Sequence, residues 1–312
     1  MKLETLNKKF RANGKLLIAG EYAVLDGGLA FAIPTKLGQT LEVEYLKSIN
    51  KPKLKWEAYL QNHSLWFSAE FDLKTLEIVQ SSNAKLASEL WKIFSAIEKL
   101  NPEFFQNQNQ NIQCKTQMEF PKDWGLGSSS TLIYLLAKWT SVDLFELNRL
   151  TFNTSGYDVA CASMNSPLFY QNLGIEKRIE PIEFHPSFAE QLYFVHLNQK
   201  QDTQINVFKN YRELPKDLDW VNSVSTVSYN MAKAESLAEF ETLMSLHEEL
   251  ISSKLNLPKV KDLYFSDYEG SVKSLGAWGG DFVLVTAREE FLNYFTSKGY
   301  STILHFKDLE SC

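Results

Sequence analysis

The segment Phe120–Trp139 has the residue types that could bind a phosphate. It reads FPKDWGLGSSSTLIYLLAKW, so two glycines and three serines separate a candidate strand ending at Met118 from an amphipathic helix. A helix N-terminus offers unpaired N–H groups and a partial positive charge, and glycines let the backbone wrap an anion. Ser128, Ser129 and Ser130 could add hydroxyl donors or a magnesium ligand. An ordinary serine N-cap explains the same residues, so this segment alone leaves both interpretations open.

Three other segments combine charge or glycine with apolar runs. Arg11–Pro34 places Lys15 directly before the apolar run 16–19. Thr154–Ala162 places Asp158 among small apolar residues, and Lys273–Ala287 is a glycine loop that leads into a predicted buried strand at 282–286. A cation held in a cleft could neutralise a transferring phosphate or lower the pKa of a carboxylate. Taken singly, a solvated lysine and a capping aspartate are the simpler interpretations, because such residues are mostly exposed.

Glycine is grouped in this chain of 312 residues. Of its 14 glycines, ten lie in four short segments, which are the segments described above. Grouped glycines indicate close approach of the backbone to a ligand. Known glycine motifs of other classes fit poorly. A Rossmann fingerprint needs a third glycine where Ser130 stands, the Walker A spacing is absent, and Asp281-Phe282 is followed by Val283 rather than by the glycine of protein kinases.

The four segments together resemble the GHMP kinases (galactokinase, homoserine kinase, mevalonate kinase and phosphomevalonate kinase), in the order that this family has. Gly14-Lys15 through Gly20-Glu21-Tyr22 is similar to the first motif, and Gly125–Ser130 is similar to the phosphate loop. Gly276–Asp281 is similar to the third motif, and Ser155–Asp158 to the segment of the catalytic aspartate. Lys200–Thr203 lies where the family often has a lysine and a serine–threonine pair near the substrate.

The resemblance implies a two-lobed α+β fold with the active site between the lobes. It implies an N-terminal ATP-binding domain at 1–175, of the ribosomal-protein-like α/β type with a left-handed βαβ unit, and a ferredoxin-like C-terminal domain at 176–312. It also implies an ATP- and Mg²⁺-dependent phosphotransferase, which transfers the γ-phosphoryl group to the hydroxyl or phosphate of a small molecule. This agrees with the general requirement of phosphoryl transfer for positioning and electrostatic stabilisation.

The resemblance also implies roles for individual residues. Asp158 would be the base or orienter of the acceptor oxygen, and Lys15 would lower its pKa and stabilise developing charge. The segment of Gly125, Leu126, Gly127, Ser128, Ser129 and Ser130 would cradle the phosphates. Ser129 would bind magnesium, with Glu146 as a second candidate ligand. The predicted substrate-binding residues are Glu21, Tyr22, Lys200, Thr203, Gly276, Ala277, Trp278 and Gly279.

The acceptor stays open at this point. GKLLIAGEYAVLDGG and the ending GGD favour phosphomevalonate kinase, whereas the SGYD segment suits mevalonate kinase equally well. We therefore expect a kinase of the mevalonate pathway and of isoprenoid biosynthesis. Trp278 stands where the third motif normally has glycine, and it either fills part of the substrate pocket or moves the loop. The alternatives are a catalytically silent relative that binds a nucleotide or metabolite as a sensor, and a kinase for another small alcohol or sugar.

Charge and composition exclude several other classes of protein. The net charge of −6 argues against a nucleic-acid partner, and no apolar run is long enough for a membrane span. Three separated cysteines exclude a disulfide framework or a CxxC metal site, and the five histidines lack metal-site spacing. We expect a cytoplasmic protein whose partner is a small-molecule substrate, present as a monomer or a homodimer.

Residue patterns predict the elements that position these segments. Period-2 alternation predicts strands at 54–60, 65–71 and 112–118, which we expect in an antiparallel sheet. Helical spacing predicts helices at 86–97, at 132–139 and along 231–251. We expect a polar surface loop at 106–113, a domain boundary within 174–186, and a solvated helix face at Glu248-Glu249. Runs of strands with few helices between them favour an α+β fold.

Overall fold

A computed structural model describes residues 7–48, 50–198, 209–276, 278 and 280–310. The chain forms two compact units. Unit 1 comprises Met1–Gly14, Leu37–Lys122 and Gly127–Ser163, and unit 2 comprises Lys15–Lys36, Asp123–Leu126 and Met164–Cys312. The long strands β1 (Asn7–Ala19) and β2 (Ala30–Lys47) contribute residues to both units, so the units interleave along the sequence. The single boundary expected after residue 175 stays a prediction.

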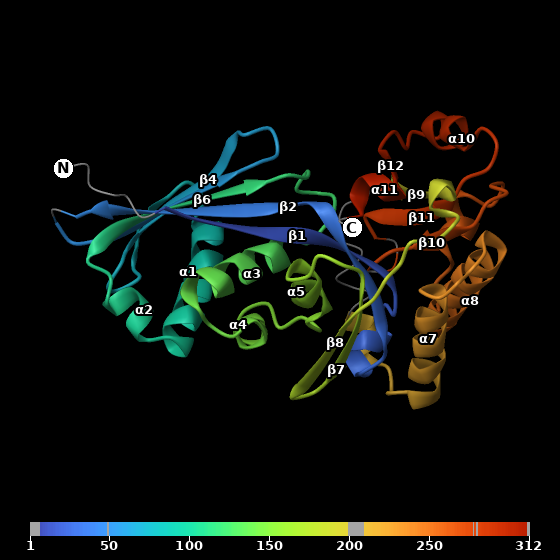
Figure 1. Cartoon of the computed structure of the whole chain (residues 1–312), viewed down its shortest axis with the longest axis horizontal. Coiled ribbons are helices and arrows are strands. Elements are labelled where there is room, and N and C mark those ends of the chain that lie inside the picture. Colours follow the sequence, from blue (N-terminus) through green and yellow to red (C-terminus); the bar gives the residue numbers. More distant parts are fainter. Residues whose placement is uncertain (1–6, 49, 199–208, 277, 279, 311–312) are drawn as a thin grey trace. The chain divides into compact units, whose positions relative to one another are not determined.

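Unit 1 is a mixed sheet with its helices on one face (Figure 1). In the order β5-β4-β3-β6-β2, only the pair β3 and β6 is parallel. The sheet is therefore not purely antiparallel as expected, because alternation reports which face is buried and not the direction of a strand. The strands are β3 (Lys53–Tyr59), β4 (Leu65–Asp72), β5 (Ile78–Ser81) and β6 (Gln110–Met118). The helices are α1 (Ala84–Leu100), α2 (Glu103–Gln106), α3 (Ser128–Thr140), α4 (Leu144–Leu150) and α5 (Tyr157–Ala162).

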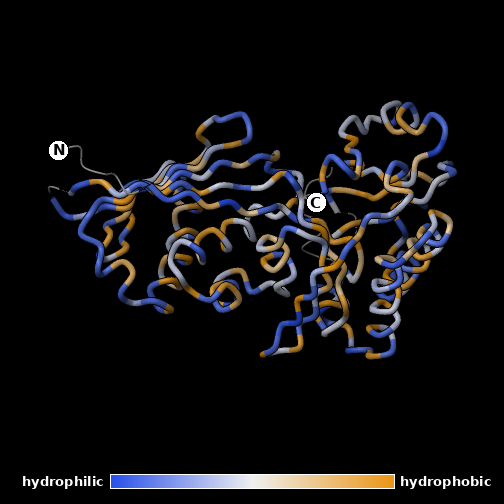
Figure 2. Tube along the Cα trace, in the orientation of Figure 1, coloured by the Kyte–Doolittle hydropathy of each residue, from blue (hydrophilic) through white to orange (hydrophobic). Residues whose placement is uncertain are grey.

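The strands predicted from alternation in unit 1 bury apolar side chains against α1 and α3. Figure 2 shows the mixture of apolar and polar residues along these strands. The polar loop expected at 106–113 is only partly correct. Residues 110–113 belong to β6, where Ile112 pairs with Leu54 of β3 and Tyr45 of β2 and is 1% exposed. The packing of this single isoleucine between two strands outweighs the polar character of its neighbours.

Unit 2 contains a four-stranded antiparallel sheet in the order β10-β11-β9-β12 and a β-hairpin that pairs with residues 30–32 of β2. The segment expected as a domain boundary, 174–186, begins with the turn of this hairpin at Gly174. The strands are β7 (Leu168–Leu173), β8 (Glu176–Pro181), β9 (Leu192–His196), β10 (Val272–Ser274), β11 (Phe282–Thr286) and β12 (Ile303–His305).

Two paired helices, α7 (Leu218–Met231) and α8 (Leu237–Leu255), make up most of the helical part of unit 2. The helical pattern expected along 231–251 is interrupted, because α7 ends at Met231 and Ser236 caps a new helix by accepting a hydrogen bond from the Glu239 N–H. The shorter helices are η1 (Ala23–Asp26), η2 (Ala189–Gln191), α9 (Val260–Tyr264), α10 (Phe291–Ser297) and α11 (Phe306–Leu309). The predicted α+β class is confirmed.

Candidate active site

The N-terminus of α3 in unit 1 is built to face an anion. Gly127 precedes the helix in the left-handed conformation, with φ of 89°, and no side-chain hydrogen bond caps this helix end. The Ser130 hydroxyl donates to the Gly127 carbonyl at 2.9 Å, so this serine stabilises the turn. Ser129 is exposed and Ser128 is half-buried. The first N–H groups of α3 therefore remain available to a negatively charged group.

A cavity of about 220 Å³ lies beside this helix end, within unit 1. Ser128 and Ser129 form part of its wall, and the remaining wall is largely aromatic and aliphatic. The Lys122 ammonium lies 4.7 Å from the centre of the Trp66 ring, a cation–π contact in the same wall. Trp56, Glu89, Met118 and Phe152 also line this cavity. Phosphate donors therefore adjoin a slot that can hold a flat ring.

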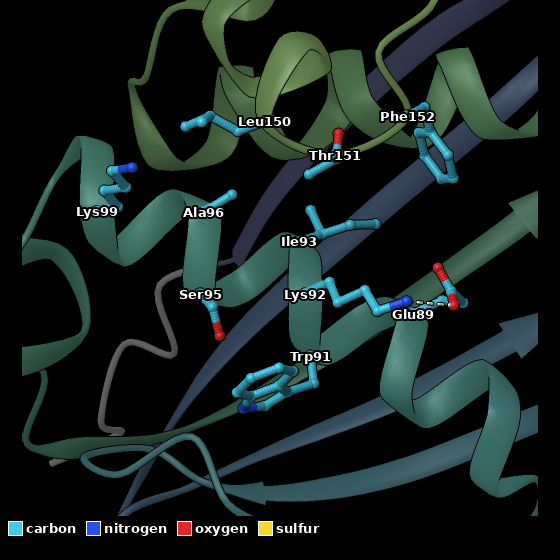
Figure 3. Close-up of a pocket in the computed structure, with 10 residues that line it drawn as sticks. All are labelled: Glu89, Trp91, Lys92, Ile93, Ser95, Ala96, Lys99, Leu150, Thr151 and Phe152. Carbon is cyan, nitrogen blue, oxygen red and sulfur yellow. Dashed lines mark hydrogen bonds and ion pairs between the residues drawn. The ribbon is translucent and has the colours of Figure 1, made fainter.

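A second cavity of about 320 Å³ in unit 1 lies between α1 and the segment that follows α4 (Figure 3). It shares Glu89, Ile93 and Phe152 with the first cavity, and an ion pair of 2.8 Å joins Glu89 to Lys92. No glycine and no aspartate lines it. We assign no chemistry to this cavity.

Asp158 lies in the first turn of α5 in unit 1 and is half-buried. Gly156, with φ of 96°, makes the sharp entry to this helix. The Thr154 hydroxyl donates to Asp158 Oδ1 at 2.8 Å, and the Asn148 amide donates to the same hydroxyl at 3.0 Å. A chain of two hydrogen bonds thus orients the carboxylate, which a base or an orienting group requires.

Lys15 in unit 2 holds the first half of the phosphate loop. Its Nζ donates to the Gly125 carbonyl at 3.0 Å, and its backbone N–H donates to the Leu126 carbonyl at 3.0 Å. Asp281 of the third motif packs against the same loop. A Cβ added at Gly125, where φ is 63°, would lie 1.7 Å from Asp281 Oδ2. The first glycine of the loop is therefore required both by its conformation and by this contact.

A cluster of charged side chains is buried in unit 2 behind the first and third motifs. Lys273 is fully buried, and its Nζ lies 2.8 Å from Glu21 Oε1. His247 Nε2 lies 3.0 Å from Glu21 Oε2 and accepts a hydrogen bond of 3.0 Å from the Gly20 N–H. Glu248 accepts from the Ser274 N–H at 3.1 Å. Glu248 is only 2% exposed, so the solvated face expected at Glu248-Glu249 is wrong for Glu248, while Glu249 is exposed.

The protonation of this cluster follows from its burial. Burial raises the pKa of Glu21, but the charge of Lys273 and the contact with His247 outweigh burial and leave the pKa lowered. Burial, with the Lys273 charge, lowers the pKa of His247. Burial raises the pKa of Glu248 to about 8. At neutral pH Glu21 is therefore ionised, His247 is neutral and Glu248 is largely protonated.

Sequence reasoning missed His247 and Lys273, and the sequence holds a signal only for His247. His247 is three residues after Met244 and four before Ile251, so it lies on the buried stripe of α8. Lys273 lies in the short strand β10, directly between two buried neighbours.

Tyr22 and Trp278 lie together in an aromatic cluster of unit 2. Each is 6% exposed. The Trp278 backbone N–H donates to the Tyr22 hydroxyl at 2.8 Å, and its indole N–H donates to the Pro258 carbonyl at 3.0 Å. The Trp278 side chain thus points into the interior of unit 2.

The other candidate residues give less evidence. Lys200, Thr203, Ala277 and Gly279 lie outside the described residues. Gly276 adopts a φ of 69°. Glu146 makes an exposed ion pair of 2.6 Å with Arg149, and within the described part of the chain no three His, Cys, Asp or Glu side chains gather as a metal site. The exposed Ser129 hydroxyl suits a magnesium ligand, but the Glu146 carboxylate already has a cationic partner, so the residues present do not make a complete metal site.

No family model matches this sequence, and no curated protein matches it either. Solved structures do match over nearly the full length. Mevalonate kinase from Methanococcus jannaschii is 16% identical, with 97% of this chain and 98% of that chain covered and a TM-score of 0.65. Phosphomevalonate kinase from Streptococcus pneumoniae, solved with phosphomevalonate and AMPPNP, is also 16% identical, with 95% and 99% covered and a TM-score of 0.65.

Galactokinase from Lactococcus lactis, solved with galactose, is 13% identical, with 97% of this chain and 93% of that chain covered and a TM-score of 0.65. This chain has the GHMP kinase fold. The fold predicted from the four glycine segments is therefore confirmed. Among the described residues, no helix is long and apolar enough to cross a membrane.

Proposed function

We propose that this protein is an ATP-dependent kinase that transfers the γ-phosphoryl group to a small-molecule acceptor. The observation that carries the proposal is the uncapped N-terminus of α3 beside an aromatic cavity, both within unit 1. ATP has the two parts that such a site fits. Its phosphates suit the helix N–H groups, and its base suits the slot at Trp66 and Lys122. The GHMP kinase fold supports the same conclusion.

In the proposed reaction, an acceptor oxygen attacks the γ-phosphorus, the bond from phosphorus to the bridging oxygen breaks, and ADP leaves. From a hydroxyl acceptor the proton passes to the Asp158 carboxylate, which Thr154 orients through Oδ1. A phosphate acceptor attacks through an oxygen that is already ionised, and no proton transfer is then needed. The Lys15 ammonium counters the negative charge that develops during transfer. The backbone N–H groups at the start of α3 hold the phosphates in place. Magnesium, when bound, would screen the phosphate charge; we assign it Ser129 alone among the residues of this chain.

We propose an acceptor from the mevalonate pathway, either mevalonate or 5-phosphomevalonate, because the first and third motifs resemble those enzymes. The neighbours of known fold include enzymes named for mevalonate, phosphomevalonate and galactose, so the test must include acceptors of several kinds.

The proposal is tested by ADP release with ATP, Mg²⁺ and one acceptor at a time from mevalonate, 5-phosphomevalonate, homoserine and galactose. We expect one of the first two to stimulate ADP release strongly over the rate with ATP alone. Stimulation by galactose or homoserine instead would support a kinase but would contradict an acceptor from the mevalonate pathway. ATP binding without stimulation by any of the four would favour a nucleotide sensor.

A further inference from the structure

Two contacts tie the first motif to the third motif inside unit 2. The Lys273 ammonium pairs with Glu21 at 2.8 Å, and the Trp278 backbone N–H donates to the Tyr22 hydroxyl at 2.8 Å. Glu21 and Tyr22 are adjacent in sequence, whereas Lys273 and Trp278 lie on either side of Gly276. The strand that leads into the glycine loop, at Lys273, and a residue within the loop, Trp278, are thus both attached to one short turn.

This turn has an unusual backbone conformation. Tyr22 has φ of 60° and ψ of −45°, in a region that residues other than glycine rarely adopt. Such a conformation persists only where the surroundings hold it, and it is frequent at functional sites. The surroundings are present here: the Tyr22 ring lies 5.2 Å from the Tyr211 ring, and the Gly20 N–H on the preceding side donates to His247.

Gly20, two residues before Tyr22, is also constrained. Its φ is 98°, and an added Cβ would lie 2.5 Å from the Leu29 carbonyl oxygen. A side chain at this position would move the turn, and Glu21 and Tyr22 with it.

The side chains of Glu21, Tyr22 and Trp278 are suited to holding the turn and the loop in position rather than to contact with a substrate. Glu21, Tyr22 and Trp278 are each 6% exposed or less, and each has a partner within unit 2. The indole of Trp278 is fixed to Pro258, so it would have to leave the core to touch a ligand.

We propose that Tyr22 is a positioning residue, which fixes the third glycine loop by accepting a hydrogen bond from the backbone N–H of Trp278. The Glu21–Lys273 pair ties the same turn to β10, the strand that precedes the loop. This inference rests on the proposed function, because it is the kinase resemblance that places the loop at the acceptor. It replaces direct substrate contact as the role of Tyr22 and Trp278, and it makes the Tyr22 hydroxyl a determinant of acceptor affinity.

Tyr22→Phe removes the hydroxyl and retains the ring. Tyr211→Phe is the matched control, because it removes a hydroxyl from the neighbouring ring, where the partner is Asp26 at 2.6 Å. Both variants are labelled with ¹⁵N-tryptophan, which gives seven backbone amides and seven indole signals. Trp278 is assigned by comparison with Trp278→Phe.

We expect Tyr22→Phe to speed hydrogen exchange of the Trp278 backbone amide about tenfold, because one hydrogen bond is lost. The Trp278 indole, which donates to Pro258, should keep its exchange rate. Tyr211→Phe should change neither signal. An unchanged exchange rate of the Trp278 backbone amide in Tyr22→Phe would contradict the proposed role of the Tyr22 hydroxyl. An equally large increase of this rate in Tyr211→Phe would contradict it as well.

The kinetic arm uses whichever of the four acceptors supports ADP release. Tyr22→Phe should raise the KM for that acceptor about tenfold and leave the KM for ATP unchanged, and Tyr211→Phe should alter neither. Equal changes in both KM values would overturn the positioning role, since they indicate a general structural effect. If no acceptor supports turnover, the proposed function falls, while the exchange measurement still decides whether Tyr22 holds the loop.

Discussion

At the residue scale, the most consequential finding is a buried group of four ionisable side chains next to the first motif. Lys273, Glu21, His247 and Glu248 are all nearly excluded from water. A buried charge is costly unless it is paired, and here Lys273 supplies the pairing for Glu21. Glu21 Oε2 and His247 Nε2 lie 3.0 Å apart, and burial together with the Lys273 charge lowers the pKa of His247.

Glu248 gives a pH prediction whose sign follows from its pKa, about 8 in the folded protein against 4.5 ordinarily. Between these values the folded state retains a proton that the unfolded state loses, so stability falls as pH rises through this window. Glu248→Gln should remove this dependence. The free energy of unfolding of the wild type should fall relative to the variant by up to about 5 kcal/mol from pH 4.5 to 8.

Urea denaturation of both proteins across this pH range measures the effect. Glu249→Gln is the control, because Glu249 is exposed and its pKa is lowered by Lys259 rather than raised. Parallel pH profiles of the wild type and Glu248→Gln would show that Glu248 is ionised throughout.

Some residues of the candidate site could be predicted from the sequence, whereas their contacts could not. Lys15, Gly125 and Asp158 were singled out by residue type and by family order. The contact of Asp281 with Gly125 and the His247–Glu21 contact join residues far apart in the chain. No local pattern encodes such pairings. The sequence pattern does report the buried stripe of α8, which would have indicated that His247 is buried. The strand β10 reads Val-Lys-Ser and gives no such indication for Lys273.

At the element scale, α3 and the strands beside it form the proposed nucleotide site. The helix begins directly after a left-handed glycine and has no side-chain cap, and Ser128 and Ser129 of its first turn lie in the wall of the first cavity. The strands of unit 1 supply the aromatic part of that wall.

Trp66→Ala should weaken ATP binding about tenfold, because aromatic stacking on a base contributes about 1–3 kcal/mol. Trp91→Ala is the matched control. Trp91 is an exposed tryptophan of α1 that lines the second cavity of unit 1 and not the first (Figure 3). Isothermal titration with ATP measures both. An unchanged Kd in Trp66→Ala, or a loss of affinity in Trp91→Ala alone, would place the base elsewhere.

Most of the strands and helices were predicted correctly from the sequence, but the pairing of two strands and one break between helices were not. Strands at 54–60, 65–71 and 112–118 and the helix at 86–97 were correct, because one face of each is buried and the period is clear. The parallel pairing of β3 with β6 was not foreseen, since the helical crossover α1 that reverses the chain leaves no mark in the alternation. The break between α7 and α8 was hidden because apolar spacing continues across it.

At the scale of the whole molecule, the GHMP kinase fold extends over 95–97% of the chain in the structures compared, at 13–16% identity. At this level of identity the grouped glycines are the part of the sequence that still reports the fold. Two of them, Gly125 and Gly20, lie where the backbone closely approaches another part of the chain. The acceptor is not encoded in the same way, because side chains rather than backbone select it.

The central claim is that Asp158 serves phosphoryl transfer from ATP to a small molecule. ³¹P NMR of wild-type reactions with mevalonate or 5-phosphomevalonate should show the γ-phosphate resonance of ATP replaced by that of a phosphorylated acceptor, with ADP formed in equal amount. Asp158→Asn should slow this conversion by about 10²–10⁴-fold and bind ATP as the wild type does. Conversion at the wild-type rate in Asp158→Asn, or no phosphorylated acceptor with the wild type, would contradict the account.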